Sequence, residues 1–174
     1  MEGKINLEIF GKYEPRMNPG EKKIGLKDIP RMRVAFVSRT GPYSEFLEAM
    51  KTLMSWVTNR GIKPLGPPMG IYYNSPASVR PDELRWDIAI PVPDGVDGED
   101  EIAVRELPGG KFVYAFHQGP YDQVRAVYDE LFAFIGQNSL RPTGPPMEIY
   151  LSDPAKVKPQ EMTTEIRVPV ATAG

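Results

Sequence analysis

The sequence predicts an α+β fold in which two related strand–helix–strand–strand modules share a largely antiparallel sheet and place their helices on one face. The first observation behind this prediction is a repeat. Residues 24–92 align without gaps onto residues 102–170, and 21 of the 69 paired positions are identical. The second is that each copy contains three short β-rich runs and one run with helical spacing. Two copies are too few for a solenoid, so we expect a pseudo-twofold pair with a ligand cleft between the halves.

The repeat also predicts how the chain is divided. We expect one domain over residues 1–174, because this length and a hydrophobic content of 41% are typical of a single globular unit. Residues 24–92 form the first module, residues 93–101 an acidic linker that contains glycine, and residues 102–170 the second module. Residues 1–23 lie outside the repeat as an N-terminal extension. Apolar residues alternate there at positions 5, 7 and 9, which leaves an accessory strand and a tail as open alternatives.

Composition and charge exclude several functional classes. A formal net charge of −2 argues against a nucleic-acid-binding face, which needs clustered positive charge. No apolar run is long enough to span a membrane and no signal-peptide core is present, so we expect a cytoplasmic protein without membrane contact. The absence of cysteine removes disulfides, thiolate metal sites and thiol nucleophiles. The single histidine, His117, has no companion for a triad or a metal site, and no phosphate-binding loop or dinucleotide fingerprint occurs. We therefore expect no metal and no cofactor.

The first copy predicts one helix and three strands. Apolar residues recur at helical spacing over residues 46–57, with Ser44 as the expected N-cap and Gly61 as the residue that follows the helix. Runs rich in β-branched and aromatic residues predict strands at 33–38, 69–73 and 84–92.

The second copy repeats this order. It predicts strands at 111–117, 147–151 and 162–170 and a helix at 122–137. Trp56 and Phe134 occupy matching helix positions, and we expect both to pack in the core together with Trp86.

Strand parity selects the candidate ligand site, because successive side chains of a strand point to opposite faces. In the last strand, Ile166 and Val168 are assigned to the helix side, which leaves Glu165 and Arg167 on the face without helices. In the middle strands, the residues assigned to the helix side are the apolar ones: Met69, Ile71, Met147 and Ile149. The same reasoning gathers the remaining site candidates around Glu165 on the helix-free face: Phe36, Tyr72, Asp87, Tyr114, Phe116 and Tyr150.

A face that gathers aromatic rings around carboxylates suits a hydrophobic ligand, and a cationic one in particular. A buried carboxylate without a partner is costly, which motivates an incoming positive charge. Several alternatives stay open. Glu165 and Asp87 could be solvated strand acids, Tyr72 and Tyr150 ordinary sheet tyrosines, and Arg167 could neutralise Glu165 without any ligand.

Three stretches resemble a known family. Before the first helix stands Gly41-Pro42-Tyr43, after it Gly66-Pro67-Pro68-Met69-Gly70-Ile71-Tyr72-Tyr73, and in the last strand Glu165-Ile166-Arg167-Val168-Pro169-Val170. Together with their repeats, over about residues 24–170, these motifs resemble the GyrI-like small-molecule-binding domain, which includes effector-binding domains of AraC-type and MerR-type multidrug regulators. The resemblance implies two fused modules with a ligand cleft between them. It also implies that Glu165 is a glutamate that meets cationic lipophilic drugs among aromatic residues.

Three functional hypotheses follow from the residues and the resemblance. The first is stand-alone binding of hydrophobic small molecules, cationic ones included, for sensing or sequestering drugs or toxins. The second is a hydrolase of cyclopropanoid natural products, which the resemblance implies because some stand-alone members resemble such hydrolases, with Glu165 as the catalytic acid–base. The third is an interaction protein whose partner is DNA gyrase or a transcriptional regulator, supported only by the acidic linker at residues 93–101. Because no helix-turn-helix accompanies the repeat, we expect no direct nucleic-acid binding.

Overall fold

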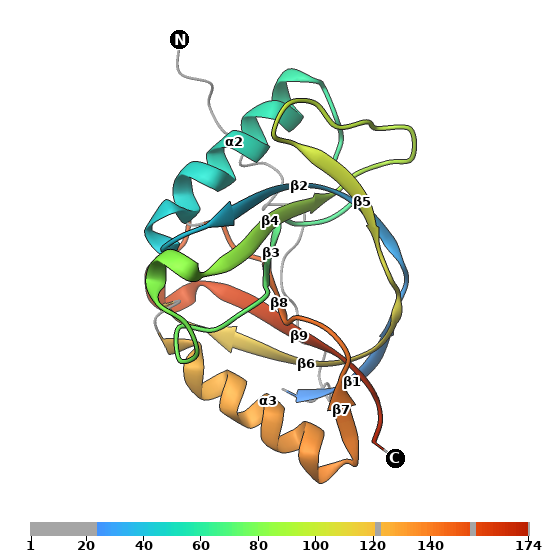
Figure 1. Cartoon of the computed structure of the whole chain (residues 1–174), viewed down its shortest axis with the longest axis vertical. Helices are drawn as coiled ribbons and strands as arrows, with labels where there is room; N and C mark the ends of the chain where they lie inside the picture. The colour runs from blue at the N-terminus through green and yellow to red at the C-terminus, as the bar shows by residue number, and fades with distance from the viewer. Residues whose placement is uncertain (1–23, 121–122, 154–155, 174) are drawn as a thin grey trace.

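The structure, a computed structural model, describes residues 24–120, 123–153 and 156–173 (Figure 1). Its two α-helices are α2 (Phe46–Asn59) and α3 (Arg125–Gln137). The strands are β1 (Ile24–Ile29), β2 (Met32–Thr40), β3 (Met69–Tyr72), β4 (Arg85–Pro91), β5 (Ala103–Leu107), β6 (Gly110–Gln118), β7 (Leu140–Pro142), β8 (Met147–Tyr150) and β9 (Thr163–Thr172). Short 3-10 turns lie in the connections: η1 (Tyr43–Glu45), η2 (Pro81–Glu83) and η4 (Pro159–Glu161).

The strands form one sheet in the order β1-β6-β9-β8-β3-β4-β2-β5, with β7 paired to β9, and every pairing is antiparallel. The predicted α+β class with a largely antiparallel sheet is therefore confirmed. This order is symmetric with respect to the repeat. The related strands β1 and β5 form the two edges, β6 and β2 come next, then β9 and β4, and β8 and β3 lie side by side at the centre.

The edge strands β1 and β5 are exchanged between the halves, since β1 pairs with β6 and β5 pairs with β2. The sequence did not indicate these strands or β7. Glycine, proline and charged residues interrupt their apolar pattern, and each of them is stabilised by pairing with strands distant in sequence rather than by its own composition.

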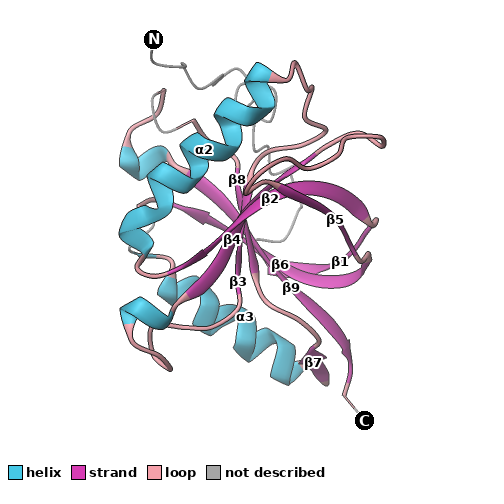
Figure 2. Ribbon diagram, turned by 45° about the horizontal axis from the view of Figure 1, so that its top comes forward, coloured by secondary structure: helices cyan, strands magenta, loops and turns pink. Residues whose placement is uncertain are grey.

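Both helices cover the same face of the sheet (Figure 2). Directly paired residues share a face, and one row of them crosses the sheet from β2 to β6: Val37, Ile88, Gly70, Glu148, Ile166 and Ala115. Ile88 belongs to the apolar cluster of α2, and Ile166 belongs to the apolar cluster of α3. Gly70 and Glu148 therefore lie at the centre of this helix-side face, between the two clusters.

The opposite face, called the helix-free face below, is also buried at its centre. Its apolar cluster includes Val34, Met69, Ile71, Ala89, Phe112, Met147 and Ile149. The sheet curves until the turn between β1 and β2 meets the turn between β5 and β6 (Figure 1). A Cβ on Gly109 would lie 2.5 Å from the backbone nitrogen of Arg31, so this close approach requires glycine.

This second buried face corrects one expectation. The prediction that the apolar residues of the middle strands face the helices is wrong, because Met69 and Ile149 pair with each other on the helix-free face. Both faces of the central strands are buried, so apolar alternation does not identify the helix side there. In the outer strands the parity assignment is confirmed, since Ile166 and Val168 pack under α3 and Trp86 packs under α2.

The sequence predicted the C-terminal end of α2 correctly but not its N-terminal cap. Ser44 lies inside η1 and no side chain caps α2, so the expected Ser44 cap is wrong. Gly61 follows the helix with φ of +65°, the left-handed conformation predicted for it. Trp56 and Phe134 pack partly buried against the two helix clusters, as predicted. The possible strand at residues 5–9 lies outside the described residues, and within the described ones no helix is long and apolar enough to cross a membrane.

Candidate functional site

One carboxylate lies at the centre of the helix-side face, where the two copies of the repeat meet. Glu148 of β8 stands directly opposite Gly70 of β3. The Tyr128 hydroxyl, from α3, donates a hydrogen bond of 2.6 Å to Glu148 Oε2, and the Tyr150 hydroxyl lies 3.5 Å from Oε1. The Tyr150 hydroxyl also shares a very short hydrogen bond with the hydroxyl of Tyr72. These four side chains, Glu148, Tyr128, Tyr150 and Tyr72, are called the Glu148 network below.

Aromatic rings of the first half extend this network. Tyr43 of η1 packs edge-on against Tyr72 with 5.5 Å between ring centroids, and Phe46 of α2 packs edge-on against Tyr150 at 5.3 Å. Trp86 of β4 contacts both, at 6.1 Å from Tyr43 and 6.3 Å from Phe46. Trp86 is buried whereas Tyr43 is 37% exposed, so the rings lead from the core to the surface.

Gly70 provides the space in which the two hydroxyl groups meet. A Cβ at this position would lie 2.6 Å from the hydroxyl oxygens of both Tyr72 and Tyr150, so any other residue would displace at least one of the two hydroxyls. The repeat aligns Gly70 with Glu148. Gly70 of the first half therefore leaves room for the two hydroxyl groups, and Glu148 of the second half supplies the only carboxylate of the network.

Burial dominates the electrostatics of the network. It raises the pKa of the Glu148 carboxyl above its ordinary value, and hydrogen bonds from Tyr128 and Tyr150 together with the charge of His117 oppose the rise only in part. Burial and the nearby carboxylate also raise the pKa of the Tyr128 and Tyr43 hydroxyls, which therefore remain donors. Among the residues that the structure describes, no lysine or arginine forms an ion pair with Glu148. The network thus holds an acid without a cationic partner.

Glu165, the acid selected from the sequence, has a different environment on the helix-free face. It is 4% exposed, Lys27 Nζ lies 2.9 Å from its Oε1, and Arg167 Nε donates to its Oε2. The Lys27 ammonium also lies 4.3 Å from the ring centroid of Tyr114 and 5.8 Å from that of Phe116. Two cations of the chain itself therefore neutralise Glu165.

The repeat-related acid, Asp87 of β4, is satisfied in the same way. Arg105 Nη2 lies 3.0 Å from Asp87 Oδ2, and the hydroxyls of Tyr73 and Ser38 each donate to the carboxylate at 2.6 Å. The Arg105 guanidinium lies 4.6 Å from the ring centroid of Phe36. In each half, then, a cation from an exchanged edge strand pairs with the carboxylate and lies over an aromatic ring.

The predicted site residues are therefore divided between two faces. On the helix-free face, as predicted, lie Phe36, Asp87, Tyr114, Phe116, Glu165 and Arg167. The placement of Tyr72 and Tyr150 beside Glu165 is wrong, because Tyr72 pairs with Trp86 and Tyr150 with Thr164 on the helix side. The cause is again that both faces of the central strands are buried, so that apolar alternation does not identify the helix side of β3 and β8. A ligand-binding role for each of these residues remains a prediction.

Sequence reasoning passed over Glu148 as a site residue, although a signal was present. Gly70 and Glu148 are flanked in both copies by the same residues, Pro-Pro-Met before and Ile-Tyr after. An acid that interrupts an otherwise identical stretch in one copy only is not required by the repeated packing. Among the described residues, no group of three or more histidine, aspartate and glutamate side chains could hold a metal ion.

Known proteins are similar to this chain in sequence, and solved structures share its fold. DNA gyrase inhibitor 2 of Dickeya dadantii (strain 3937) is 30% identical over 129 residues, which cover 71% of this chain and 82% of that protein. The crystal structure of the EcmrR C-terminal domain matches with a TM-score of 0.77 and 24% identity, over 86% of this chain and 98% of that one. The structure of SAV2435 bound to tetraphenylphosphonium matches with a TM-score of 0.54 and 15% identity, over 86% of this chain and 94% of that one.

The sequence itself gives the family. A family model, that of the GyrI-like small molecule binding domain, matches residues 22–171, which contain both helices and nearly the whole sheet. The resemblance noted in the motifs is thereby confirmed, and the chain belongs to the GyrI-like family of small-molecule-binding domains.

Proposed function

We propose that this protein binds lipophilic cations at the Glu148 network on the helix-side face. The observation that carries the proposal is the Glu148 carboxylate, which burial drives toward its neutral form and which no described lysine or arginine accompanies. An ionised carboxylate removed from water is costly unless a positive charge or several hydrogen bonds compensate for it. Tyr128 and Tyr150 donate to it but carry no charge, so a ligand cation supplies the positive charge that the described residues do not.

The rings around the network suit the rest of such a ligand. Tyr43, Phe46 and Tyr72 offer faces and edges to aromatic groups, and ring faces attract a cation through their quadrupole. Tyr43 is partly exposed, which gives a ligand a route from the surface. SAV2435, which shares the fold, was solved bound to tetraphenylphosphonium, and this supports the same cation as the first probe.

Glu165 and Asp87 are less suited to this role. Each already contacts a cation of the chain, and a ligand cation would have to displace Lys27 or Arg105. The anchor proposed here is therefore Glu148, not the acid chosen from the sequence.

The test compares two ligands of the same shape and opposite charge, tetraphenylphosphonium and tetraphenylborate. By isothermal titration, the phosphonium is expected to bind saturably and the borate at least about tenfold more weakly. The Glu148→Gln variant is expected to lose at least about tenfold of the phosphonium affinity, because it removes one charge of a desolvated pair. The exposed Glu130→Gln, on α3, changes the net charge equally and is expected to leave the affinity unchanged. Equal affinity for the two ligands would contradict the proposal.

A hydrolase is the second candidate function, favoured by the raised pKa of Glu148. A carboxyl group whose pKa lies above its ordinary value is suited to general acid–base work, and Tyr128 donates a hydrogen bond beside it. In this case ionised Glu148 would accept a proton from a water whose oxygen forms a bond to a cyclopropane carbon. One ring carbon–carbon bond would break, and a proton would neutralise the electron pair that it leaves on the rest of the compound. Incubation with a cyclopropanoid compound followed by mass spectrometry tests this. Addition of water that is lost in Glu148→Gln would support the hydrolase, and no addition above the buffer rate would exclude it for that substrate.

An interaction with DNA gyrase is a further expectation, taken from the resemblance and from the name of the Dickeya relative. It concerns a partner and does not depend on the Glu148 network. A supercoiling assay with purified gyrase tests it, and an unchanged rate at a large molar excess of this protein would contradict it.

A further inference from the structure

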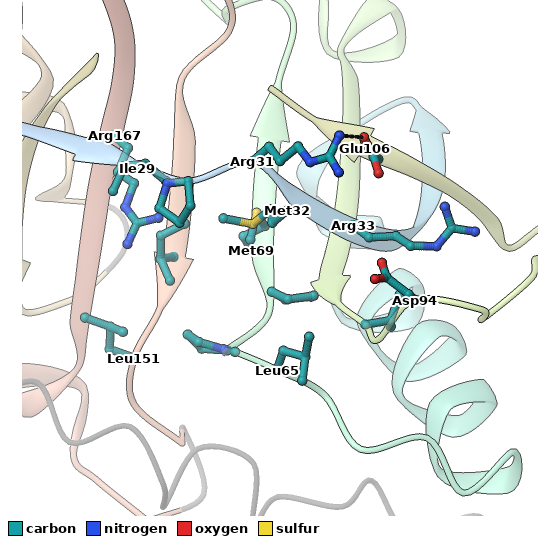
Figure 3. Close-up of a pocket in the computed structure, with 16 residues that line it drawn as sticks. Ile29, Arg31, Met32, Arg33, Leu65, Met69, Asp94, Glu106, Leu151 and Arg167 are labelled. Atoms are coloured by element: carbon teal, nitrogen blue, oxygen red, sulfur yellow. Dashed lines mark hydrogen bonds and ion pairs between the residues drawn. The ribbon is translucent and has the colours of Figure 1, made fainter. Parts of the chain in front are cut away.

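A groove lies on the helix-free face, on the other side of the sheet from the Glu148 network. Its volume is about 670 Å³, within the range of about 300–1,000 Å³ that small-molecule sites occupy. The central strands contribute an apolar floor that includes Met69 and Ile149, and Leu151 follows on the same side. In Figure 3, Arg167 and Leu151 lie along one side of the groove, Arg33 lies on the other side, and Met69 lies between them.

Arg167 brings a nearly buried positive charge to this groove. Its side chain is 16% exposed, and its Nε is used by Glu165. Lys27 occupies the other oxygen of the same carboxylate, so the cluster of Lys27, Glu165 and Arg167 carries a net positive charge. No described residue accepts a hydrogen bond from either terminal amino group of Arg167. The donors best placed for a planar, two-pronged hydrogen bond are therefore unused.

Arg33 adds a second cation with an unmatched donor. Its Nη2 donates to the Val96 carbonyl at 2.9 Å, whereas its Nε is buried and has no acceptor. The acids of the groove lie at its exposed rim, where Asp94 faces solvent and Glu106 pairs with Arg31 at 3.1 Å. Arg33 also pairs with the exposed Asp97 at 4.0 Å. The partly buried charges on the groove, those of Arg167 and Arg33, are therefore positive, while its acids are exposed and its floor is apolar.

We propose that this groove is a second ligand site, which takes an amphiphile with one carboxylate head and an apolar body. The carboxylate would accept hydrogen bonds from the terminal amino groups of Arg167, and the body would cover the apolar floor. A carboxylate accepts from two guanidinium donors at once, and its negative charge compensates the excess positive charge of the cluster. The site is independent of the Glu148 network, because the sheet separates the two and their charges have opposite sign.

The test uses three ten-carbon probes and the full chain at neutral pH. Decanoate carries the carboxylate, decanol is neutral, and decyltrimethylammonium is cationic. By isothermal titration, decanoate is expected to bind at least tenfold more tightly than either of the others. Arg167→Gln removes the charge but keeps a donor, and it is expected to weaken decanoate at least tenfold while decanol changes little.

A second variant avoids the Glu165 cluster, whose disturbance could unfold Arg167→Gln. Leu65 lines the groove and its side chain is 66% exposed, so Leu65→Glu adds a negative charge at the rim without disturbing the core. It is expected to weaken decanoate at least threefold and to leave tetraphenylphosphonium unaffected. The matched control is Leu47→Glu on α2, where the leucine is 75% exposed and does not line the groove.

Each outcome of these titrations either supports or contradicts the proposed groove site. Loss of decanoate affinity in Leu65→Glu but not in Leu47→Glu supports the site. Equal affinity for decanoate and decanol would overturn the proposal, since it reveals only a hydrophobic surface. Displacement of decanoate by tetraphenylphosphonium would also overturn it, because the two ligands would then share one site. Failure of phosphonium binding alone would contradict the proposed function and leave this groove unaffected.

Discussion

Replacing Glu165 or Glu148 with glutamine is expected to change the stability of the fold in opposite directions. Glu165→Gln should lower the free energy of unfolding by about 3 kcal/mol, the low end of the range for breaking a buried ion pair from one side. Lys27 and Arg167 would then share a site without their carboxylate, and Arg167 is largely removed from water. The exposed pair of Arg31 and Glu106 provides the control, because Glu106→Gln should cost about 1 kcal/mol or less.

Glu148→Gln should instead raise the free energy of unfolding at neutral pH. Burial raises the folded-state pKa of Glu148 above its unfolded value, so the native protein favours the protonated group. The contribution of this group to stability is fully present below the unfolded pKa and is lost as the pH rises through the folded pKa. Glutamine removes that loss, and its amide oxygen can still accept from the Tyr128 hydroxyl.

Chemical denaturation followed by circular dichroism measures both effects. Glu165→Gln should also retain phosphonium affinity at temperatures where it is folded, since Glu165 lies on the other face. A Glu165→Gln variant that is as stable as wild type and has lost the phosphonium would reverse the two roles assigned here.

The affinity for tetraphenylphosphonium is expected to rise with pH and then reach a plateau. The free protein holds Glu148 with a raised pKa, whereas a bound cation favours the carboxylate and lowers that pKa. Binding therefore releases a proton in the window between the two pKa values, and affinity falls by up to about tenfold per pH unit as the pH drops through that window.

Two tyrosine hydroxyls near Glu148 do not contribute to this profile. Burial raises the pKa of the Tyr43 and Tyr128 hydroxyls above the ordinary value, so both stay protonated over this range. Glu148→Gln removes the carboxyl group that titrates. Titration calorimetry at a series of pH values should give a steep profile for wild type and a shallow one for the variant. An identical profile in both would assign the dependence to another group.

Most of the fold could be predicted because the repeat contains the sequence pattern of each main element in two copies. Strands β2, β3, β4, β6, β8 and β9 and both helices were expected within a few residues of their observed bounds. Strand β1, with Gly25, Lys27 and Asp28 among its six residues, could not be identified from composition. Its stability comes from pairing with β6, more than eighty residues away, which no local pattern records.

The sequence predicted the types of residue that form the candidate site but not their positions in the fold. Aromatic residues around an acid with raised pKa do occur, yet parity was reversed in β3 and β8 because the helix-free face of the central strands is also buried and carries their apolar residues. That reversal moved Tyr72 and Tyr150 away from Glu165 and toward Glu148. Only one of the two partners of Glu165 could be predicted, because Lys27 lies on strand β1, which the sequence did not indicate. The acid chosen by strand parity has two cationic partners, and only Arg167 was considered as one from the sequence.

A crystal structure of the protein with tetraphenylphosphonium tests the central claim most directly. The expected result places the phosphonium on the helix-side face, with phenyl rings in van der Waals contact with Tyr43 and Tyr72 and the positive charge beside the Glu148 carboxylate. A phosphonium bound on the helix-free face beside Glu165, with Lys27 displaced, would contradict it.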